Sequence, residues 1–197
     1  MRNIPLVPKP TNPKFLDTPI GKIQDVLKDK LPWLNYSFGV VQKLTDHNSK
    51  KSTYGKLPKP YPGVHIGSKE YVNVFPDQEL GNFSFVDFQD PREVISQSRS
   101  NFLVKQKCAL VFWFNLDTIL GISEDRNLEE IELQILNVLG NDLVIDRGSL
   151  EISKVCRDSV NIYKGYDVDE QKSQFLMQPY AGLRFEGVLH YRHLKPC

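Results

Sequence analysis

Apolar residues are most concentrated in residues 105–119, KQKCALVFWFNLDTI. In a β-strand, successive side chains point to opposite faces. One face of this strand is apolar throughout and carries Cys108, Leu110, Phe112, Phe114 and Leu116. The other face is apolar for half its length and carries Ala109, Val111 and Trp113, followed by Asn115 and Asp117. A sheet with one solvated face shows cleaner alternation, so we expect other parts of the protein or a neighbouring copy to cover both sides of a strand at roughly 104–117.

Two segments show apolar residues at helical spacing instead. The first begins with Thr18 as the expected N-cap and Pro19 in the first helical position, and Pro32 ends it. Its apolar stripe consists of Ile20, Ile23, Val26, Leu27 and Leu31.

The second helical segment is RNLEEIELQILNVLGND, residues 126–142. Asn127 can cap its start, Glu130 occupies the capping-box position, and Gly140 can supply a left-handed stop. Its apolar stripe consists of Leu128, Ile131, Ile135 and Val138, supported by Leu139.

Further strands are expected at 34–44, 64–76, 81–90, 149–155 and 180–194. The segment at 64–76 reads as a hairpin with its turn near Gly67 and Ser68, and residues 92–100 read as a loose helical turn or a linker. The predicted fold class is α+β, with a mixed, largely antiparallel sheet, two main helices packed on one face, an extended N-terminal arm and long loops. The arm spans residues 1–18, and one domain spans residues 19–197.

The arm is defined by its prolines, because five of the thirteen prolines in the chain lie within the first nineteen residues. Proline excludes a helix here and disfavours an inner strand. The segment is either a disordered terminus or an extended arm that lies across a neighbouring subunit. The apolar anchors of such an arm would be Ile4, Leu6, Val7 and Phe15.

A long polar and basic loop is expected at residues 45–63, TDHNSKKSTYGKLPKPYPG. It carries Lys50, Lys51, Lys56 and Lys59 against a single acidic residue, Asp46. A structureless loop of this length is either solvated and mobile or functional. The functional interpretation is contact with an acidic partner or with the phosphate backbone of DNA.

Composition limits the function classes further. The 197 residues include 25 basic and 24 acidic ones, for a net charge of +1, which does not favour wholesale nucleic-acid binding. The three cysteines are too few and too scattered for a disulfide framework. No segment resembles a signal peptide or a membrane span, so we expect a chain made soluble, without a membrane partner.

Catalytic motifs are not found: there is no glycine-rich phosphate loop, no metalloprotease helix motif and no nucleophile elbow. His190, His193 and Cys197 could hold a metal, but a strand sends the two histidines to opposite faces. Asp146, Glu151 and Lys154 resemble the acid-acid-lysine set of metal-dependent nucleases, although the lysine falls on the wrong strand face. We therefore expect no catalytic residue, no metal and no cofactor.

Three aromatic residues follow the predicted strand at 149–155: Tyr163, Tyr166 and Phe175. They could form a stacking surface for bases or sugars. The interpretation favoured here is that they pack against their own domain or a partner subunit.

The order of these elements, together with the closing stretch SQFLMQPYAGLRFEGVLHYR at 173–192, resembles tail-terminator and neck-completion proteins of tailed bacteriophages. The chain is also similar to structural proteins of crAss-like phages that infect Bacteroides. The resemblance covers residues 19–194 and implies a sheet with helices on one face and a homo-oligomeric ring, a hexamer or a dodecamer.

The resemblance also implies a place in the virion. The subunit would be made in the host cytoplasm, join other neck, tail or portal proteins, and meet passing DNA at most through non-specific contacts. The arm and the basic loop depart from compact members of that group. Two alternatives stay open: a non-viral adaptor domain, or a metal-dependent nuclease that uses Asp146, Glu151 or His190.

Overall fold

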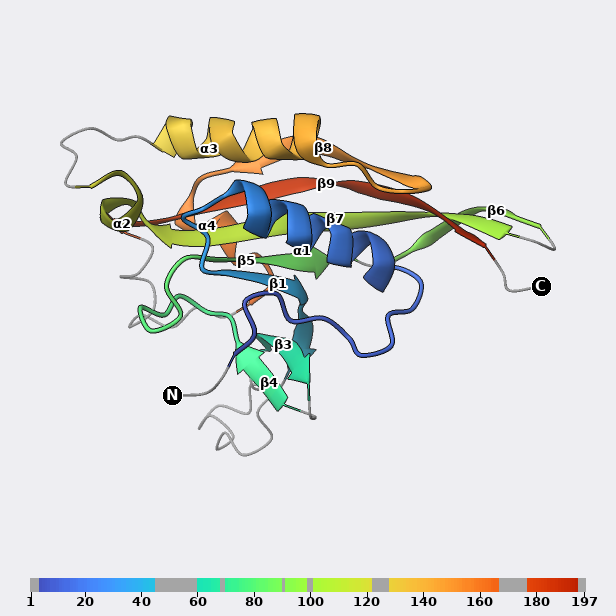
Figure 1. Cartoon of the computed structure of the whole chain (residues 1–197), viewed down its shortest axis with the longest axis horizontal. Helices are drawn as coiled ribbons and strands as arrows, with labels where there is room; N and C mark the ends of the chain where they lie inside the picture. The colour runs from blue at the N-terminus through green and yellow to red at the C-terminus, as the bar shows by residue number, and fades with distance from the viewer. Residues whose placement is uncertain are drawn as a thin grey trace, which may run out of the picture.

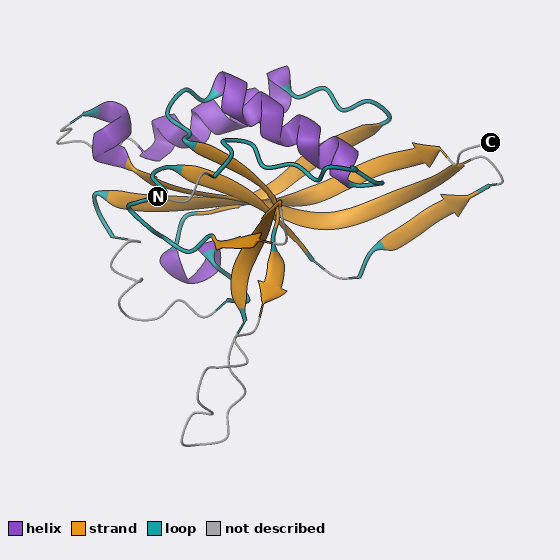
Figure 2. Cartoon of the chain, turned by 60° about the horizontal axis from the view of Figure 1, so that its bottom comes forward, coloured by secondary structure: helices purple, strands orange, loops and turns teal. Residues whose placement is uncertain are grey.

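A computed structural model describes residues 4–44, 60–67, 70–89, 91–98, 101–121, 128–166 and 177–194. They form the predicted α+β fold: one large sheet, the two longer helices on one of its faces, and a small second sheet with a short helix on the other (Figure 1; Figure 2). Within these residues, no helix combines the length and the apolar character needed to cross a membrane.

The large sheet is mixed and largely antiparallel, as expected, with the order β1-β5-β7-β9-β8 and β6 paired to β7. Only the β1–β5 pair is parallel among these strand pairs. The longest strands, β7 and β9, pair along their full length, from Asn101 opposite Leu194 to Asn115 opposite Tyr180. The strands of this sheet are β1 (Tyr36–Val40), β5 (Phe83–Phe88), β6 (Glu93–Gln97), β7 (Asn101–Asn115), β8 (Gly148–Cys156) and β9 (Tyr180–Leu194).

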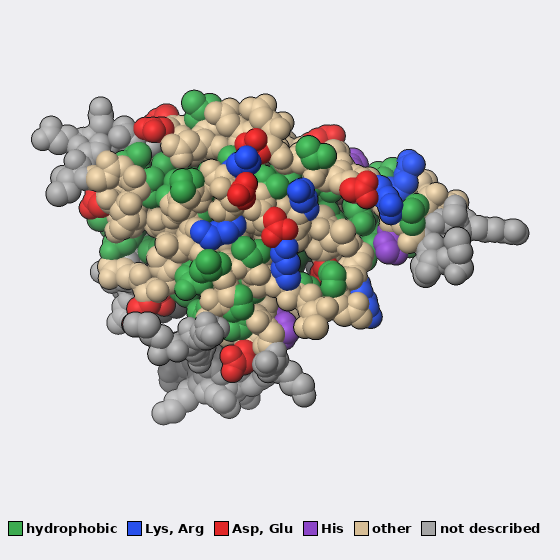
Figure 3. Space-filling view, in the orientation of Figure 1, with side chains coloured by type: hydrophobic (Ala, Val, Ile, Leu, Met, Phe, Trp, Pro, Cys, Tyr) green, Lys and Arg blue, Asp and Glu red, His purple; other side chains and the backbone are tan. Residues whose placement is uncertain are grey.

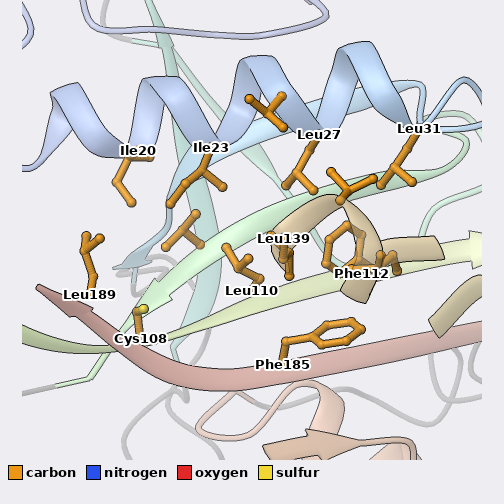
Figure 4. Close-up of a cluster of buried hydrophobic side chains, with 14 of the residues drawn as sticks. Ile20, Ile23, Leu27, Leu31, Cys108, Leu110, Phe112, Leu139, Phe185 and Leu189 are labelled. Atoms are coloured by element: carbon orange, nitrogen blue, oxygen red, sulfur yellow. The ribbon is translucent and has the colours of Figure 1, made fainter. Parts of the chain in front are cut away.

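Two amphipathic helices, α1 (Asp17–Lys30) and α3 (Leu128–Asn137), cover one face of the sheet. Their apolar stripes pack on the face of β7 that carries Cys108, Leu110 and Phe112, as Figure 4 shows for α1. Helix-to-sheet packing of this kind is the main source of stability for both helices. Both helices predicted from spacing are confirmed.

The predicted helix ends are wrong in two places. Helix α1 begins at Asp17, ahead of the expected cap Thr18, because the Asp17 carboxylate accepts a hydrogen bond from the Lys14 N–H at 2.8 Å and closes the turn there. Gly140 does not supply a left-handed stop. It lies in a π-helical turn, Val138–Asp142, that ends where the Leu143 N–H bonds to the Val138 carbonyl at 3.0 Å.

The opposite face of β7 is covered by the same chain. Ala109, Val111 and Trp113 pack in a second buried cluster with residues of a three-stranded antiparallel sheet and with Ile162 and Tyr163 of a short helical segment. Both apolar faces of β7 are therefore covered by the chain itself, and no neighbouring subunit is needed to cover the half that carries Ala109, Val111 and Trp113. The small sheet consists of β2 (Gln42–Leu44), β3 (Tyr61–Gly67) and β4 (Glu70–Asn73), and the short helix is α4 (Ser159–Ile162).

The strand expected at 34–44 is in fact two strands in two sheets. After β1, the Val41 N–H bonds to the Val86 carbonyl at 2.8 Å, and the chain then enters the small sheet as β2. The small sheet thereby forms the crossover that parallel strands such as β1 and β5 require. The predicted hairpin at 64–76 is confirmed as β3–β4, whereas β3 begins at Tyr61, inside the segment expected to be a loop.

Residues 92–100 contain a strand, so the prediction of a helical turn or linker was wrong. β6 pairs antiparallel with the start of β7, with Glu93 opposite Lys105 and Gln97 opposite Phe102. Together with the end of β9, these strands extend beyond the helices as a projection that we call the wing (Figure 2). One further helix, α2 (Leu116–Leu120), was not expected from the sequence.

Candidate functional site

The basic loop lies largely outside the described residues. Its four candidate contacts, Lys50, Lys51, Lys56 and Lys59, are all in residues 45–59, for which the structure gives no placement. Contact of these lysines with DNA or an acidic partner stays a prediction. On the face covered by α1, acidic and basic side chains are interspersed (Figure 3).

The N-terminal arm is bound to its own chain from residue 4 onward. The Leu6 carbonyl accepts a hydrogen bond from the Ser37 N–H at 2.9 Å, so the arm runs along the outer edge of β1. The buried Gln24 amide donates to the Pro8 and Ser37 carbonyls at 3.0 and 2.8 Å and fixes the arm against α1. These bonds satisfy polar groups that an open strand edge would otherwise present to solvent.

The four predicted anchors of the arm differ in exposure. Ile4 and Val7 are half-buried, and Ile4 packs against the second core cluster. Leu6 is 56% exposed and is the most exposed of the four. Phe15 is half-buried and packs against the core between the large sheet and the helices α1 and α3.

Phe15 also connects the arm to the wing. Its ring lies 5.3 Å from that of Phe102 and 5.2 Å from that of His193, and the Arg92 guanidinium stacks over it at 5.2 Å. The residue adopts a φ of 53°, a conformation unfavourable for a side chain with a Cβ. Aromatic packing and the cation–π contact offset that strain.

The outer edge of the wing is the most apolar exposed part of the sheet. All five residues of β6 are exposed, and Val94 and Ile95 retain 59% and 50% of their accessible surface. Among the described strands, β6 pairs only with β7, so its second edge presents unpaired backbone groups. An edge of this kind is a template for pairing with another chain. It is the clearest candidate interaction surface.

A buried polar network lies under the second face of the sheet. Arg184 is buried, and its guanidinium binds Asp87 at 2.9 Å, Glu186 at 3.1 Å and the Ile162 carbonyl at 3.5 Å. The Tyr166 hydroxyl donates to the second oxygen of Asp87 at 3.1 Å. Burial, reinforced by the Asp87 charge, raises the pKa of Tyr166 above its ordinary value, so the phenol stays a neutral donor. The network joins β5, β9 and the segment after α4.

The alternative of a stacking surface does not hold for the two tyrosines that the structure describes. Tyr163 is fully buried, and its hydroxyl donates to the Val74 carbonyl at 3.1 Å. Tyr166 is held by Asp87, and Phe175 lies outside the described residues. The favoured interpretation, packing against the domain, is confirmed for both tyrosines.

The residues considered for metal chemistry are distributed over β8 and β9. Asp146 lies in the turn before β8 and pairs with Arg147 at 3.2 Å, whereas Glu151 and His190 fall on the same face of neighbouring strands. His193 lies on the opposite face from His190, as expected. Among the described residues, no group of three His, Cys, Asp or Glu side chains is arranged to hold a metal ion.

A hollow of about 540 Å³ lies at the end of the large sheet where β7 ends and β9 begins. It is lined by four segments: residues 32–35, residues 78–82, the junction of β7 with α2, and Tyr180. Its volume is within the range of small-molecule sites in proteins. It was not anticipated from the sequence, because its lining residues are far apart along the chain.

No protein-family model matches the chain, and no curated protein matches its sequence.

Proposed function

We propose that the chain is a structural subunit that assembles with copies of itself into a ring in the neck or tail of a tailed bacteriophage. The observation that carries this proposal is the open edge of β6, where Val94 and Ile95 expose apolar surface beside unpaired backbone groups. Such an edge is usually blunted by charge, proline or a covering element in a monomeric protein. Pro91, Arg92 and Glu93 bring a proline and charges to the start of β6, but Val94 and Ile95 remain exposed beyond them, which supports a partner.

The proposed partner is another copy of this chain. Closed rings form when two different surfaces of the same subunit meet head to tail and the rotation closes. The β6 edge would supply one surface, and Leu6 on the arm, which runs along the outer edge of β1, is a candidate for the other. The ring would be a hexamer or a dodecamer, and it would join other neck, tail or portal proteins in the virion.

DNA would pass such a ring with non-specific contacts at most. The net charge of +1 supports this part of the proposal, because a subunit that grips DNA usually carries a basic surface. Lys50, Lys51, Lys56 and Lys59 are the candidates for those contacts.

Light scattering after size exclusion, with negative-stain images of the same sample, tests the assembly. We expect a closed ring at high concentration and a monomer for the double variant Val94→Lys, Ile95→Lys, since lysine on an edge strand opposes pairing. Both side chains are exposed, so the variant should fold normally. The matched control is Leu133→Lys on α3, which is also an exposed apolar residue (58%) but lies outside the wing.

A ring that survives the double variant would show that the β6 edge is not the contact. A strict monomer at every concentration, for the unchanged chain, would favour the alternative of a non-viral adaptor domain. Metal-dependent cleavage of DNA that is lost on replacing Glu151 or His190 would favour the nuclease alternative.

A further inference from the structure

The hollow at the end of the sheet has the chemistry of a binding site rather than of a packing gap. The described residues that line it include four side-chain amides, two tryptophans and a tyrosine, and no Asp, Glu, Lys, Arg or His. A charged ligand would lose its hydration there without a countercharge from these side chains. The lining therefore favours a neutral ligand with several hydrogen-bonding groups and an apolar face.

The floor of the hollow is held rigid by one side chain. Asn82 is buried, and its amide nitrogen donates to the Trp33 carbonyl at 3.0 Å and to the Thr118 hydroxyl at 3.2 Å. Its amide oxygen accepts from the Asn115 N–H at 2.9 Å. One asparagine thus joins the loop before β1, the start of α2 and the end of β7, so the site is formed before any ligand arrives.

Two amide NH2 groups remain available at this floor. The Asn35 oxygen accepts from the Asn82 N–H at 2.7 Å, and the Asn115 oxygen accepts from the Asp117 N–H at 3.0 Å. Because a backbone N–H can bind only the oxygen, these bonds define the orientation of both amides. Neither NH2 group donates to any described residue, and both amides line the hollow. They are two preset donors for ligand oxygens.

The aromatic wall of the hollow is formed by Trp33 and Tyr180, which are half-buried, whereas Trp113 is buried against Tyr180. The Trp33 indole nitrogen donates to Gln134 at 3.1 Å, which fixes the ring. Tyr180 stacks on Trp113 with 5.4 Å between ring centroids and 13° between planes, and its hydroxyl accepts from the Gln78 amide. Fixed aromatic rings supply an apolar contact surface at low entropic cost.

We propose that this hollow binds a neutral saccharide unit. A sugar ring combines an apolar C–H face, which suits the aromatic wall, with a rim of hydroxyl and ring oxygens that can accept from Asn35 and Asn115. Gln78 also lines the hollow, and its side-chain oxygen can accept from a sugar hydroxyl. The inference does not depend on the proposed ring, since all of these groups come from one chain.

Intrinsic fluorescence of the full chain tests the proposal directly, because both tryptophans of the sequence, Trp33 and Trp113, line the hollow. The probes are glucose, galactose, mannose, N-acetylglucosamine, maltose and cellobiose. A capped dipeptide, N-acetyl-alanyl-alaninamide, tests the competing peptide class, and N-acetyltryptophanamide measures the bulk effect of sugar on emission. We expect a saturable change with at least one saccharide.

Two variants locate the binding. Asn115→Ser removes one NH2 donor but keeps an oxygen that can cap α2, and Gln78→Ala removes an exposed amide. Each should weaken saccharide binding roughly tenfold, as loss of one hydrogen bond does. The matched control is Asn73→Ser in β4, where the oxygen of the exposed Asn73 likewise accepts a backbone N–H, from Phe75 at 3.0 Å, away from the hollow.

The proposal is overturned by any of three results. The first is that no saccharide in the panel changes the emission beyond the bulk effect at concentrations up to about 100 mM, well above the millimolar range of weak sites. The second is that Asn115→Ser and Gln78→Ala both bind as tightly as the unchanged chain. The third is that the capped dipeptide binds and no saccharide does.

Discussion

Arg184 and Asp87 belong to strands that are not neighbours, yet the guanidinium Nη2 and the carboxylate Oδ2 are 2.9 Å apart. β7 lies between the two strands, and its residue at this level is Ala109, which is opposite Asp87 on one side and Glu186 on the other. The small alanine side chain leaves room for Arg184 to reach across. The two side chains are 1% and 7% exposed, so the ion pair is shielded from water.

Removing one partner of this pair should destabilise the fold strongly. Asp87→Ala leaves a buried guanidinium without its main counterion, although Glu186 remains at 3.1 Å, and we expect a loss of about 3–5 kcal/mol in the free energy of unfolding. Urea denaturation measures the loss. The control is Asp25→Ala at the exposed pair with Lys9, where a loss of at most about 1 kcal/mol is expected. Equal losses would show that Arg184 is not held by Asp87.

Gly81 should be essential to the shape of the hollow. It has a φ of 66°, and a Cβ at this position would lie 2.5 Å from the Asn35 oxygen. Gly81→Ala should therefore cost the strain of a left-handed alanine plus the displacement of the Asn35–Asn82 hydrogen bond, together about 2–4 kcal/mol. The melting temperature and urea midpoint measure this cost.

The comparison for Gly81 is Gly121, which has a φ of 76° and open space around its Cα. Gly121 also has a ψ of −174°, a combination that is essentially restricted to glycine, so Gly121→Ala should cost only backbone strain, about 1–3 kcal/mol. A Gly81→Ala variant as stable as the unchanged chain would show that neither the φ of Gly81 nor the approach of Asn35 restricts this position.

The parts of the fold that could be predicted from the sequence are those where one side of an element is buried. The sequence indicated the apolar stripes of α1 and α3 and the two apolar faces of β7, because buried side chains must be apolar. The spacing of buried side chains along the chain differs between a helix and a strand, so it also indicated the type of element. β6 was missed for the opposite reason. All of its residues are exposed, and it exists as a strand only because it pairs with β7, which no local pattern of EVISQ indicates.

The buried polar residues and the hollow were harder to predict from the sequence than the order of helices and strands. Alternation along residues 180–194 places Arg184 and Glu186 on a polar face, which is normally solvated, and the structure buries Arg184 instead. The half-apolar second face of β7 could have indicated this burial. Arg184 lies opposite Val111 of that face, so it is buried in the same layer of side chains. The hollow could not be found from sequence, because Asn35, Asn82 and Asn115 meet only after three segments have folded.

The arm should contribute to folding as well as to any assembly. Deleting residues 1–18 removes Phe15 and the buried Leu16, and it also leaves the Gln24 amide without its bond to the Pro8 carbonyl. We expect the truncated chain to lose several kcal/mol of stability, as deletion of one or two core side chains does. Circular dichroism during thermal unfolding measures this loss.

A point variant separates the two roles of the arm. Leu6→Asp changes a side chain that is exposed in the subunit, so stability should stay within about 0.5 kcal/mol while assembly is weakened. A Leu6→Asp chain as unstable as the truncated one would mean that Leu6 packs in the subunit. A truncated chain as stable as the full one would mean that the arm contacts are not formed in solution.

The stability of the protein should decrease as the pH rises above about 9, because of Cys108. Burial raises the pKa of this thiol from 9.0 to about 12. In the unfolded chain the thiol loses its proton near pH 9, whereas the folded chain retains it, so unfolding is favoured between these two values by up to about 1.4 kcal/mol per pH unit. Urea denaturation at about pH 8, 9 and 10 measures the slope, and no contribution from this thiol is expected below pH 9.

The variant Cys108→Ala assigns the slope to this residue. Between pH 9 and 10 the variant should lose less stability than the unchanged chain, since the titrating group is gone. Tyr163 and Tyr166, whose pKa values are also raised by burial, act in the same direction but only above their ordinary value of 10.0. Identical slopes in the two proteins would show that the Cys108 thiol reaches solvent in the folded chain, and the packing of β7 against α1 and α3 would then be looser than the structure shows.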